Sequence, residues 1–118
     1  MLSLPTPVRI CVARGATDMR NSIDGLAALT AQALEQEPMS GHLFVFCNRD
    51  RDRIKILYWE RSGFWLLHKR LKRGTFAWPL PEGSEAKQLE MPASDLAAML
   101  GGIDLKNASR RRWYSRDS

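Results

Sequence analysis

The spacing of apolar residues predicts one strand and one helix in the first third of the chain. Val8, Ile10 and Val12 alternate with Arg9, Cys11 and Ala13, which predicts a strand within residues 8–14. Apolar side chains within residues 19–36 recur every three or four positions, which predicts an amphipathic helix. Pro38 and Gly41 mark its end. Gly25 counts against this helix, because glycine in a helix interior costs up to ~1 kcal/mol relative to alanine.

The centre of the chain reads as a β-meander. The predicted strands cover residues 42–48, 53–60, 64–71 and 75–78. The first of them, "HLFVFCN", is almost wholly apolar, as expected of a strand covered on both faces. The triplets Arg61-Ser62-Gly63 and Lys72-Arg73-Gly74 each end in glycine. A hairpin loop with a type I turn and a left-handed last residue has this pattern.

The stretch "FWLLHKRLKR" at residues 64–73 fits two structures. As a helix, it would align Leu67 and Leu71 with Phe64 and place its four basic residues on the opposite side, with Gly74 as a stop. As a strand, it would mix apolar and charged residues on both faces. The glycine-ended connections on either side favour the strand.

The pattern continues with a short strand within residues 86–91 and a short helix at residues 94–100. A chain of 118 residues has the usual length of one domain. The predicted fold class is therefore α+β: a single small domain with an antiparallel meander, one main amphipathic helix and a short C-terminal helix. We expect this domain to cover residues 1–106 and to be followed by a basic, flexible tail at 107–118.

Composition restricts the class of protein further. Apolar residues make up 44% of the chain and charged residues 26%, which is ordinary for a globular protein. No apolar run approaches the ~20 residues that span a bilayer, and the first residues lack the pattern of a signal peptide. We therefore expect a cytoplasmic protein with no membrane contact. Cys11 and Cys47 are too few for a disulfide scaffold and are expected to be reduced core residues.

Motifs for catalysis or metal binding are missing from the sequence. The spacings of His42, His68, Cys11 and Cys47 match no zinc pattern. There is no nucleophile elbow, no phosphate-binding loop and no dinucleotide fingerprint. We therefore expect no metal, no cofactor and no enzymatic activity. A deep pocket that holds an acid or base with a shifted pKa would indicate otherwise.

Charge is the most informative feature of the composition. The chain carries a net charge of +5, and residues 49–73 alone hold nine Lys or Arg against three Asp or Glu. Cations release counterions from phosphates, and exposed aromatic rings stack on unpaired bases. Trp59 and Trp65 suit either this stacking role or the core, because apolar residues adjoin both. The candidate nucleic-acid contacts are Arg49, Arg51, Arg53, Lys55, Arg61, Lys69, Arg70, Lys72 and Arg73, with Arg110, Arg111 and Arg112 in the tail.

Four segments together resemble a known family. They are "TDMRNSIDGLAAL", "GHLFVFCNRDRDRIKILYWE", "GFWLLHKRLKRGTFAWP" and "LGGIDL", in this order between Val8 and Leu105. The chain is similar to the small accessory protein of the IS sixty-six insertion-sequence family. This is the TnpB or second-open-reading-frame type, unrelated to the RNA-guided nuclease of the same label. The resemblance implies a role in transposition beside a DDE-type transposase, and it supplies no catalytic residues.

The resemblance adds Arg20 to the candidate contacts and draws attention to the pair Lys69-Arg70. It also shows two departures. Arg61 lies in a turn that is usually acidic and glycine-rich in the family, and Pro92 stands where a capping Ser or Thr is common.

Two functions fit these observations. One is a non-catalytic accessory factor that binds nucleic acid, with element DNA favoured, through residues 49–73 and the arginine tail. The other is a protein adaptor that docks on the transposase and binds no nucleic acid itself. The expected partners are nucleic acid, the transposase and other proteins of the same element.

Overall fold

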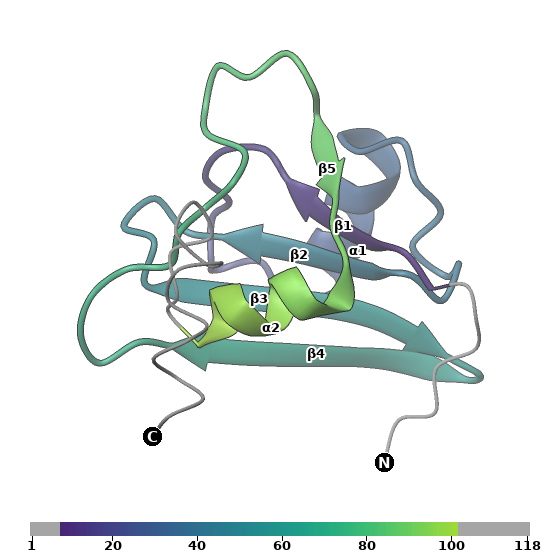
Figure 1. Ribbon diagram of the computed structural model, residues 1–118. Helices are drawn as coiled ribbons and strands as arrows, with labels where there is room; N and C mark the ends of the chain where they lie inside the picture. Colours follow the sequence, from purple (N-terminus) through teal and green to yellow (C-terminus); the bar gives the residue numbers. More distant parts are fainter. Residues whose placement is uncertain (1–7, 102–118) are drawn as a thin grey trace.

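The computed structural model describes residues 8–101, which form five strands and two helices around one sheet (Figure 1). In chain order the elements are β1 (Ile10–Ala13), α1 (Ile23–Gln32), β2 (Leu43–Cys47), β3 (Arg53–Glu60), β4 (Gly63–Arg70), β5 (Gln88–Glu90) and α2 (Ala93–Leu100). The strand order across the sheet is β4-β3-β2-β1-β5. This arrangement confirms the predicted α+β class.

The sheet is mixed because its strands are connected in two ways. β1 and β2 are parallel neighbours, and α1 is the crossover that parallel strands need. β2, β3 and β4 follow one another as antiparallel neighbours, which confirms the meander in this part of the chain. β5 returns from the far end of the sequence to pair antiparallel with β1.

The two helices cover opposite faces of the sheet, with α2 in front and α1 behind in Figure 1. Successive residues of a strand point to opposite faces, so the central strands supply both cores. The core on the α2 side contains Ile10, Val12, Val45, Cys47, Ile54, Ile56, Phe76, Met91, Leu96 and Met99. The core on the α1 side contains Cys11, Ala13, Leu26, Leu34, Phe44, Phe46 and Leu57. Coverage on both faces explains why β2 is almost wholly apolar, as predicted.

The predicted strand at residues 75–78 is wrong. The chain leaves the sheet after β4 and crosses the α2 side as an irregular segment. There Phe76 is buried, and the indole Nε1 of Trp78 donates to the backbone oxygen of Ala13 at 3.1 Å. The prolines at 79 and 81 cannot donate to a strand ladder. The apolar pattern therefore reports a loop that packs against the core and not strand pairing.

Helix α1 is shorter than predicted, because residues 19–22 form a turn before it. Ser22 occupies the N-cap position, where its side chain makes no capping hydrogen bond. After the helix, Glu35 adopts a positive φ of 56°, which ends the helical path. The predicted C-terminal helix is confirmed as α2, which begins directly after Pro92 without a side-chain cap.

The alternative of strand or helix for residues 64–73 is decided in favour of the strand, since β4 covers Gly63–Arg70. Its hairpin turn is tighter than predicted. Gly63 pairs with Glu60, so the turn consists of Arg61 and Ser62 alone. Arg61 has the positive φ of 57° that was expected at Gly63.

Candidate nucleic-acid interface

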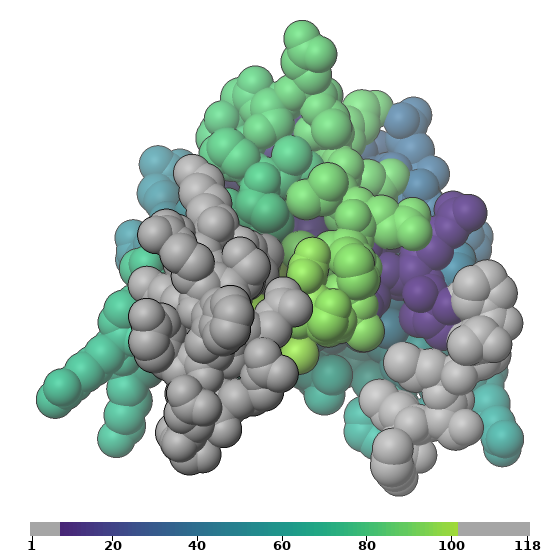
Figure 2. All heavy atoms as spheres, in the orientation of Figure 1, coloured from purple at the N-terminus to yellow at the C-terminus, as the bar shows by residue number. Residues whose placement is uncertain are grey.

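Strand directions collect six of the ten predicted cations within residues 8–101 at one end of the sheet. β2 ends, β3 begins and β4 ends on the same side, because the three strands are antiparallel neighbours. The basic end, as we call it, consists of Arg49, Arg51, Arg53, Arg70, Lys72 and Arg73. In Figure 2, teal side chains project from this side of the molecule, on the left. Arg61 lies at the opposite end of the β3–β4 hairpin.

Three loops at the basic end are joined to one another. Backbone hydrogen bonds run from Thr17 N to Cys47 O (2.7 Å), from Leu71 N to Asp52 O (2.8 Å) and from Phe76 N to Arg51 O (2.6 Å). The side-chain oxygen of Asn48 also accepts from the backbone N–H groups of Asp52 and Arg53, each at 3.0 Å. The cations are therefore mounted on a connected frame.

Arg53 and Arg70 are directly opposite each other on β3 and β4. Like charges in this position repel, so the pair is unfavourable without an anion. The next pair on the same face of the ladder is Lys55 with His68, two positions along each strand. The pKa of His68 is lowered from its ordinary value, first by partial burial and then by the positive charges of Lys55, Arg53 and Arg70. After burial, the neighbouring positive charges are therefore the second cause of this lowered pKa.

The positive charge of the basic end is not neutralised within the described part of the chain. The ion pairs among residues 8–101 join Arg9 to Glu90, Arg20 to Asp18 and Lys87 to Glu35, all outside the basic end. No side chain of the basic end takes part in them or donates a hydrogen bond to another residue between 8 and 101. Asp50 and Asp52 are the nearby acids in sequence, and Asp52 accepts a hydrogen bond from Asn48 at 2.6 Å.

Two lysines of the predicted contact set instead hold the fold together. Lys55 is 9% exposed, and its Nζ donates to the backbone oxygens of Met19 and Asn21, each at 2.8 Å. Lys69 Nζ donates to the backbone oxygen of Leu100 at 2.6 Å, at the C-terminus of α2. A cation there satisfies a free carbonyl and the negative end of the helix dipole. Sequence reasoning missed both tasks, because the partners lie more than thirty residues away.

Arg20 lies on the loop that precedes α1, where Asp18 holds it. Its guanidinium donates to both carboxylate oxygens of Asp18, and its backbone N–H donates to Oδ1 at 2.9 Å. These hydrogen bonds from Arg20 lower the pKa of Asp18 to about 2. The Arg20 side chain is nevertheless 91% exposed, so part of its guanidinium surface faces solvent.

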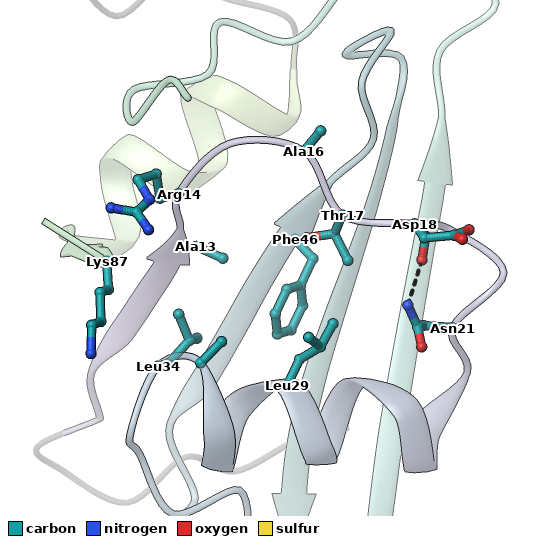
Figure 3. A pocket seen from close by; sticks show the side chains of 11 residues that line it. Ala13, Arg14, Ala16, Thr17, Asp18, Asn21, Leu29, Leu34, Phe46 and Lys87 are labelled. Carbon is teal, nitrogen blue, oxygen red and sulfur yellow. Dashed lines mark hydrogen bonds between the residues drawn. The ribbon is translucent and has the colours of Figure 1, made fainter. Parts of the chain in front are cut away.

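A pocket of about 300 Å³ lies between this loop and the C-terminal half of α1 (Figure 3). Leu29, Leu34 and Phe46 form its apolar floor, and Asp18 is a carboxyl group at its rim. With its pKa lowered to about 2, Asp18 stays a carboxylate at neutral pH. A general acid or base needs a pKa near the working pH, so this group is poorly suited to proton transfer.

Among residues 8–101, no group of three His, Cys, Asp or Glu side chains is placed to hold a metal ion. Cys11 and Cys47 are free and buried, which confirms their prediction as reduced core residues. Burial raises the pKa of both thiols, in the case of Cys47 to about 11. In this part of the chain, no helix is long and apolar enough to cross a membrane.

The tryptophans lie away from the basic end. Trp59 is half-buried and makes an edge contact with Phe64, with ring centroids 5.0 Å apart. Trp65 is 49% exposed, and its indole Nε1 donates to Glu60 at 3.0 Å. Five residues of extended strand separate Trp65 from Arg70, or roughly 17 Å. Arg110, Arg111 and Arg112 lie outside the described residues, as does the predicted boundary between domain and tail.

Fold and surface together define a small basic α+β domain. The family model described as "IS66 Orf2 like protein" (TnpB_IS66) matches residues 8–110, nearly the whole chain. The chain therefore belongs to this family of insertion-sequence accessory proteins, as the sequence motifs indicated.

Two curated relatives from Sinorhizobium fredii (strain NBRC 101917 / NGR234) are similar along most of their length. Uncharacterized protein y4hO is 36% identical over 107 residues, covering 91% of this chain and 90% of the relative. Uncharacterized protein y4jC is 33% identical over 105 residues, covering 88% and 86%. No solved structure matches the chain.

Proposed function

We propose that this protein is a non-catalytic accessory factor of transposition that binds the DNA of its insertion sequence through the basic end. One observation carries the proposal. Six cations are gathered on a hydrogen-bonded frame, and no partner within the described residues neutralises them. A phosphate backbone supplies the anions that such a surface lacks.

The contact would be made with phosphates and not with stacked bases. Trp65 lies at the other half of β4, and Trp59 packs against Phe64. Phosphate contacts fix position on a duplex but carry no sequence information. The accessory protein would therefore bind and position the DNA, while sequence choice would remain with the transposase.

A salt series on binding to a short DNA duplex tests this proposal. Each phosphate contact lowers the slope of log K against log salt by about 0.9. We expect Arg70→Glu to weaken binding and to reduce the magnitude of that slope by about 1. The matched control is Arg9→Glu, which makes a like charge reversal before β1, at the opposite end of the sheet. Affinity that is flat from low to moderate salt, or equal losses in both variants, would overturn the proposal.

A second candidate function is an adaptor that docks on the transposase. The exposed edge of β4 favours it, because Trp65 and Leu67 offer an apolar surface separate from the basic end. Co-purification with the transposase in the presence of nuclease, together with no shift of any duplex or single strand, would select this function. Co-purification that nuclease abolishes would select DNA binding.

A further inference from the structure

The outer edge of β4 is open in the described part of the chain. β4 is the last strand in the sheet order and pairs only with β3, although it is eight residues long. Figure 1 shows it along the lower border of the sheet. A long edge strand presents unpaired N–H and C=O groups that can pair with another strand.

Side chains on β4 are also unusually apolar for an open edge. Trp65 is 49% exposed and Leu67 is 42% exposed, and both point to the same face because they are two residues apart. They are two of four large apolar residues that are exposed among residues 8–101. Apolar side chains on an unpaired edge mark it as an interaction surface.

The two halves of β4 have complementary chemistry. Its first half is aromatic and apolar, with Phe64, Trp65 and Leu66, and its second half is basic, with His68, Lys69 and Arg70. Parallel pairing of two such strands would place basic residues opposite basic residues. Antiparallel pairing about Leu67 places Lys69 opposite Trp65 and Arg70 opposite Phe64, and pairing about Leu66 places His68 opposite Phe64. Cations lie favourably against aromatic rings, so antiparallel pairing brings the basic residues of one copy next to the aromatic rings of the other.

From this pattern we propose that β4 is a homodimer interface, in which two copies pair antiparallel along their edges to form one continuous ten-stranded sheet. The partner is a second copy of this chain, because the same strand supplies both complementary halves. A two-fold interface must be complementary to itself in this way. Trp65 of one copy then lies beside Leu67 or Lys69 of the other, which covers the exposed indole.

The proposed dimer forms without DNA and responds differently to salt. Both copies carry a net charge of +5 and repel each other at long range. Screening by salt reduces this repulsion, whereas it weakens contacts with phosphates. We therefore expect the dimer to persist or tighten between low and moderate salt, while DNA affinity falls. Loss of one behaviour without the other identifies which proposal has failed.

Sedimentation of the full chain across a concentration series is the first test. We expect a dimer of twice the chain mass of 13.4 kDa. Leu67→Glu places two carboxylates in the centre of the interface and should weaken dimerisation at least about thirtyfold, a loss typical of a central interface residue. The matched control is Met39→Glu, since Met39 is 51% exposed and lies between α1 and β2. A monomer at all concentrations, or equal weakening by both variants, overturns the proposal.

Disulfide cross-linking tests the orientation and does not depend on destabilising variants. Opposed residues of an antiparallel pair have Cα atoms about 4.5–5.5 Å apart, within reach of a disulfide. Mild oxidation should cross-link Leu66→Cys or Leu67→Cys into a dimer but not Met39→Cys. The native Cys11 and Cys47 are buried and do not interfere. If neither β4 variant cross-links faster than Met39→Cys, the antiparallel edge dimer is wrong.

Discussion

Lys55, Lys69 and Arg70 lie within three consecutive cross-strand pairs of β3 and β4, yet each meets a different environment. Lys55 is buried against two backbone carbonyls, Lys69 reaches the end of α2, and Arg70 faces Arg53. The sequence predicted one shared task for all three, because composition reports charge and not partners. What separates them is tertiary contact with segments more than thirty residues away. Of the three, only Arg70 makes no side-chain hydrogen bond or ion pair with another residue between 8 and 101.

His68 offers a direct measure of whether an anion arrives at this site. Its pKa lies below the ordinary value of 6.5 because of burial and the charges of Lys55, Arg53 and Arg70. Bound phosphate would offset those charges, so we expect the pKa of His68 to rise when a short DNA duplex is added. An NMR titration of its ring signal with and without DNA checks this. His42, which precedes β2 at the opposite end, provides a control signal that should not respond.

The same shift has a consequence for stability without DNA. A lowered folded-state pKa means that the folded protein binds fewer protons than the unfolded chain between the two values. The contribution of His68 is thus present at neutral pH and is lost as the pH falls from 6.5 through the folded-state pKa. Replacing His68 with Gln should remove this part of the pH dependence in urea unfolding. An unchanged profile, or a pKa that falls on DNA addition, would contradict this account of the site.

At the scale of elements, the spacing of apolar residues predicted strands and helices correctly where each element packs against the core on its apolar side. The apolar run of β2 and the helical spacing of α1 were both interpreted correctly, because β2 is covered on both faces and α1 packs on one face of the sheet. The segment at residues 75–78 was misread, since Phe76 and Trp78 pack from a loop onto the core and give the same apolar signal as a strand. The spacing of apolar residues reports which side chains are buried. It does not report strand pairing, because the neighbouring strand lies elsewhere in the sequence.

Gly25 illustrates a local cost with a structural reason. A Cβ at this position in α1 would collide with the side-chain oxygen of Asn21. Asn21 cannot turn away freely, because its amide donates to the backbone oxygen of Asp18 at 3.0 Å. In this fold the glycine that weakened the helix prediction therefore makes room for the loop that precedes the helix.

Substitution of Gly25 by alanine tests helix propensity against the collision with Asn21. Helix propensity alone would stabilise the protein by about 1 kcal/mol. We expect Gly25→Ala to destabilise it instead, by roughly 1 kcal/mol, as the collision displaces Asn21 from its hydrogen bond. In an Asn21→Ala background the collision is absent, so the same substitution should be stabilising. Urea unfolding of the four proteins measures the coupling, and a stabilising Gly25→Ala in the wild type would refute the collision.

At the scale of the whole molecule, long-range pairing places the surface where it is. The sheet joins β1 to β5 across most of the chain, and no local pattern indicated that pairing. By contrast, the gathering of cations at one end follows from the meander, which was predicted correctly for β2, β3 and β4. The position of the basic end could therefore be predicted from the sequence in general terms. The sequence did not predict which cations make hydrogen bonds within the fold and which make none.

Arg61 connects the two proposals, because an antiparallel β4 dimer brings the Arg61–Ser62 turn of one copy towards the basic end of the other. Within one copy, Arg61 lies at the wrong end of the hairpin to share a DNA contact with Arg70. In the dimer it would extend the partner's cationic surface. The positive charge that departs from the family pattern would then act on the DNA bound by the second copy.

A double-variant cycle on DNA affinity tests this coupling. If one phosphate contact is lost, Arg61→Glu should reduce the salt slope by about 1 in the wild-type background. In the Leu67→Glu background, where the dimer is disrupted, the same substitution should change affinity little, since Arg61 no longer lies near the bound DNA. Additive effects of the two substitutions would mean that Arg61 acts within its own copy or not at all. The expected result is that Arg61→Glu weakens DNA binding only in the background that dimerises, whereas Arg70→Glu weakens it in both backgrounds. That result would place Arg61 of one copy and Arg70 of the other on one DNA-binding surface.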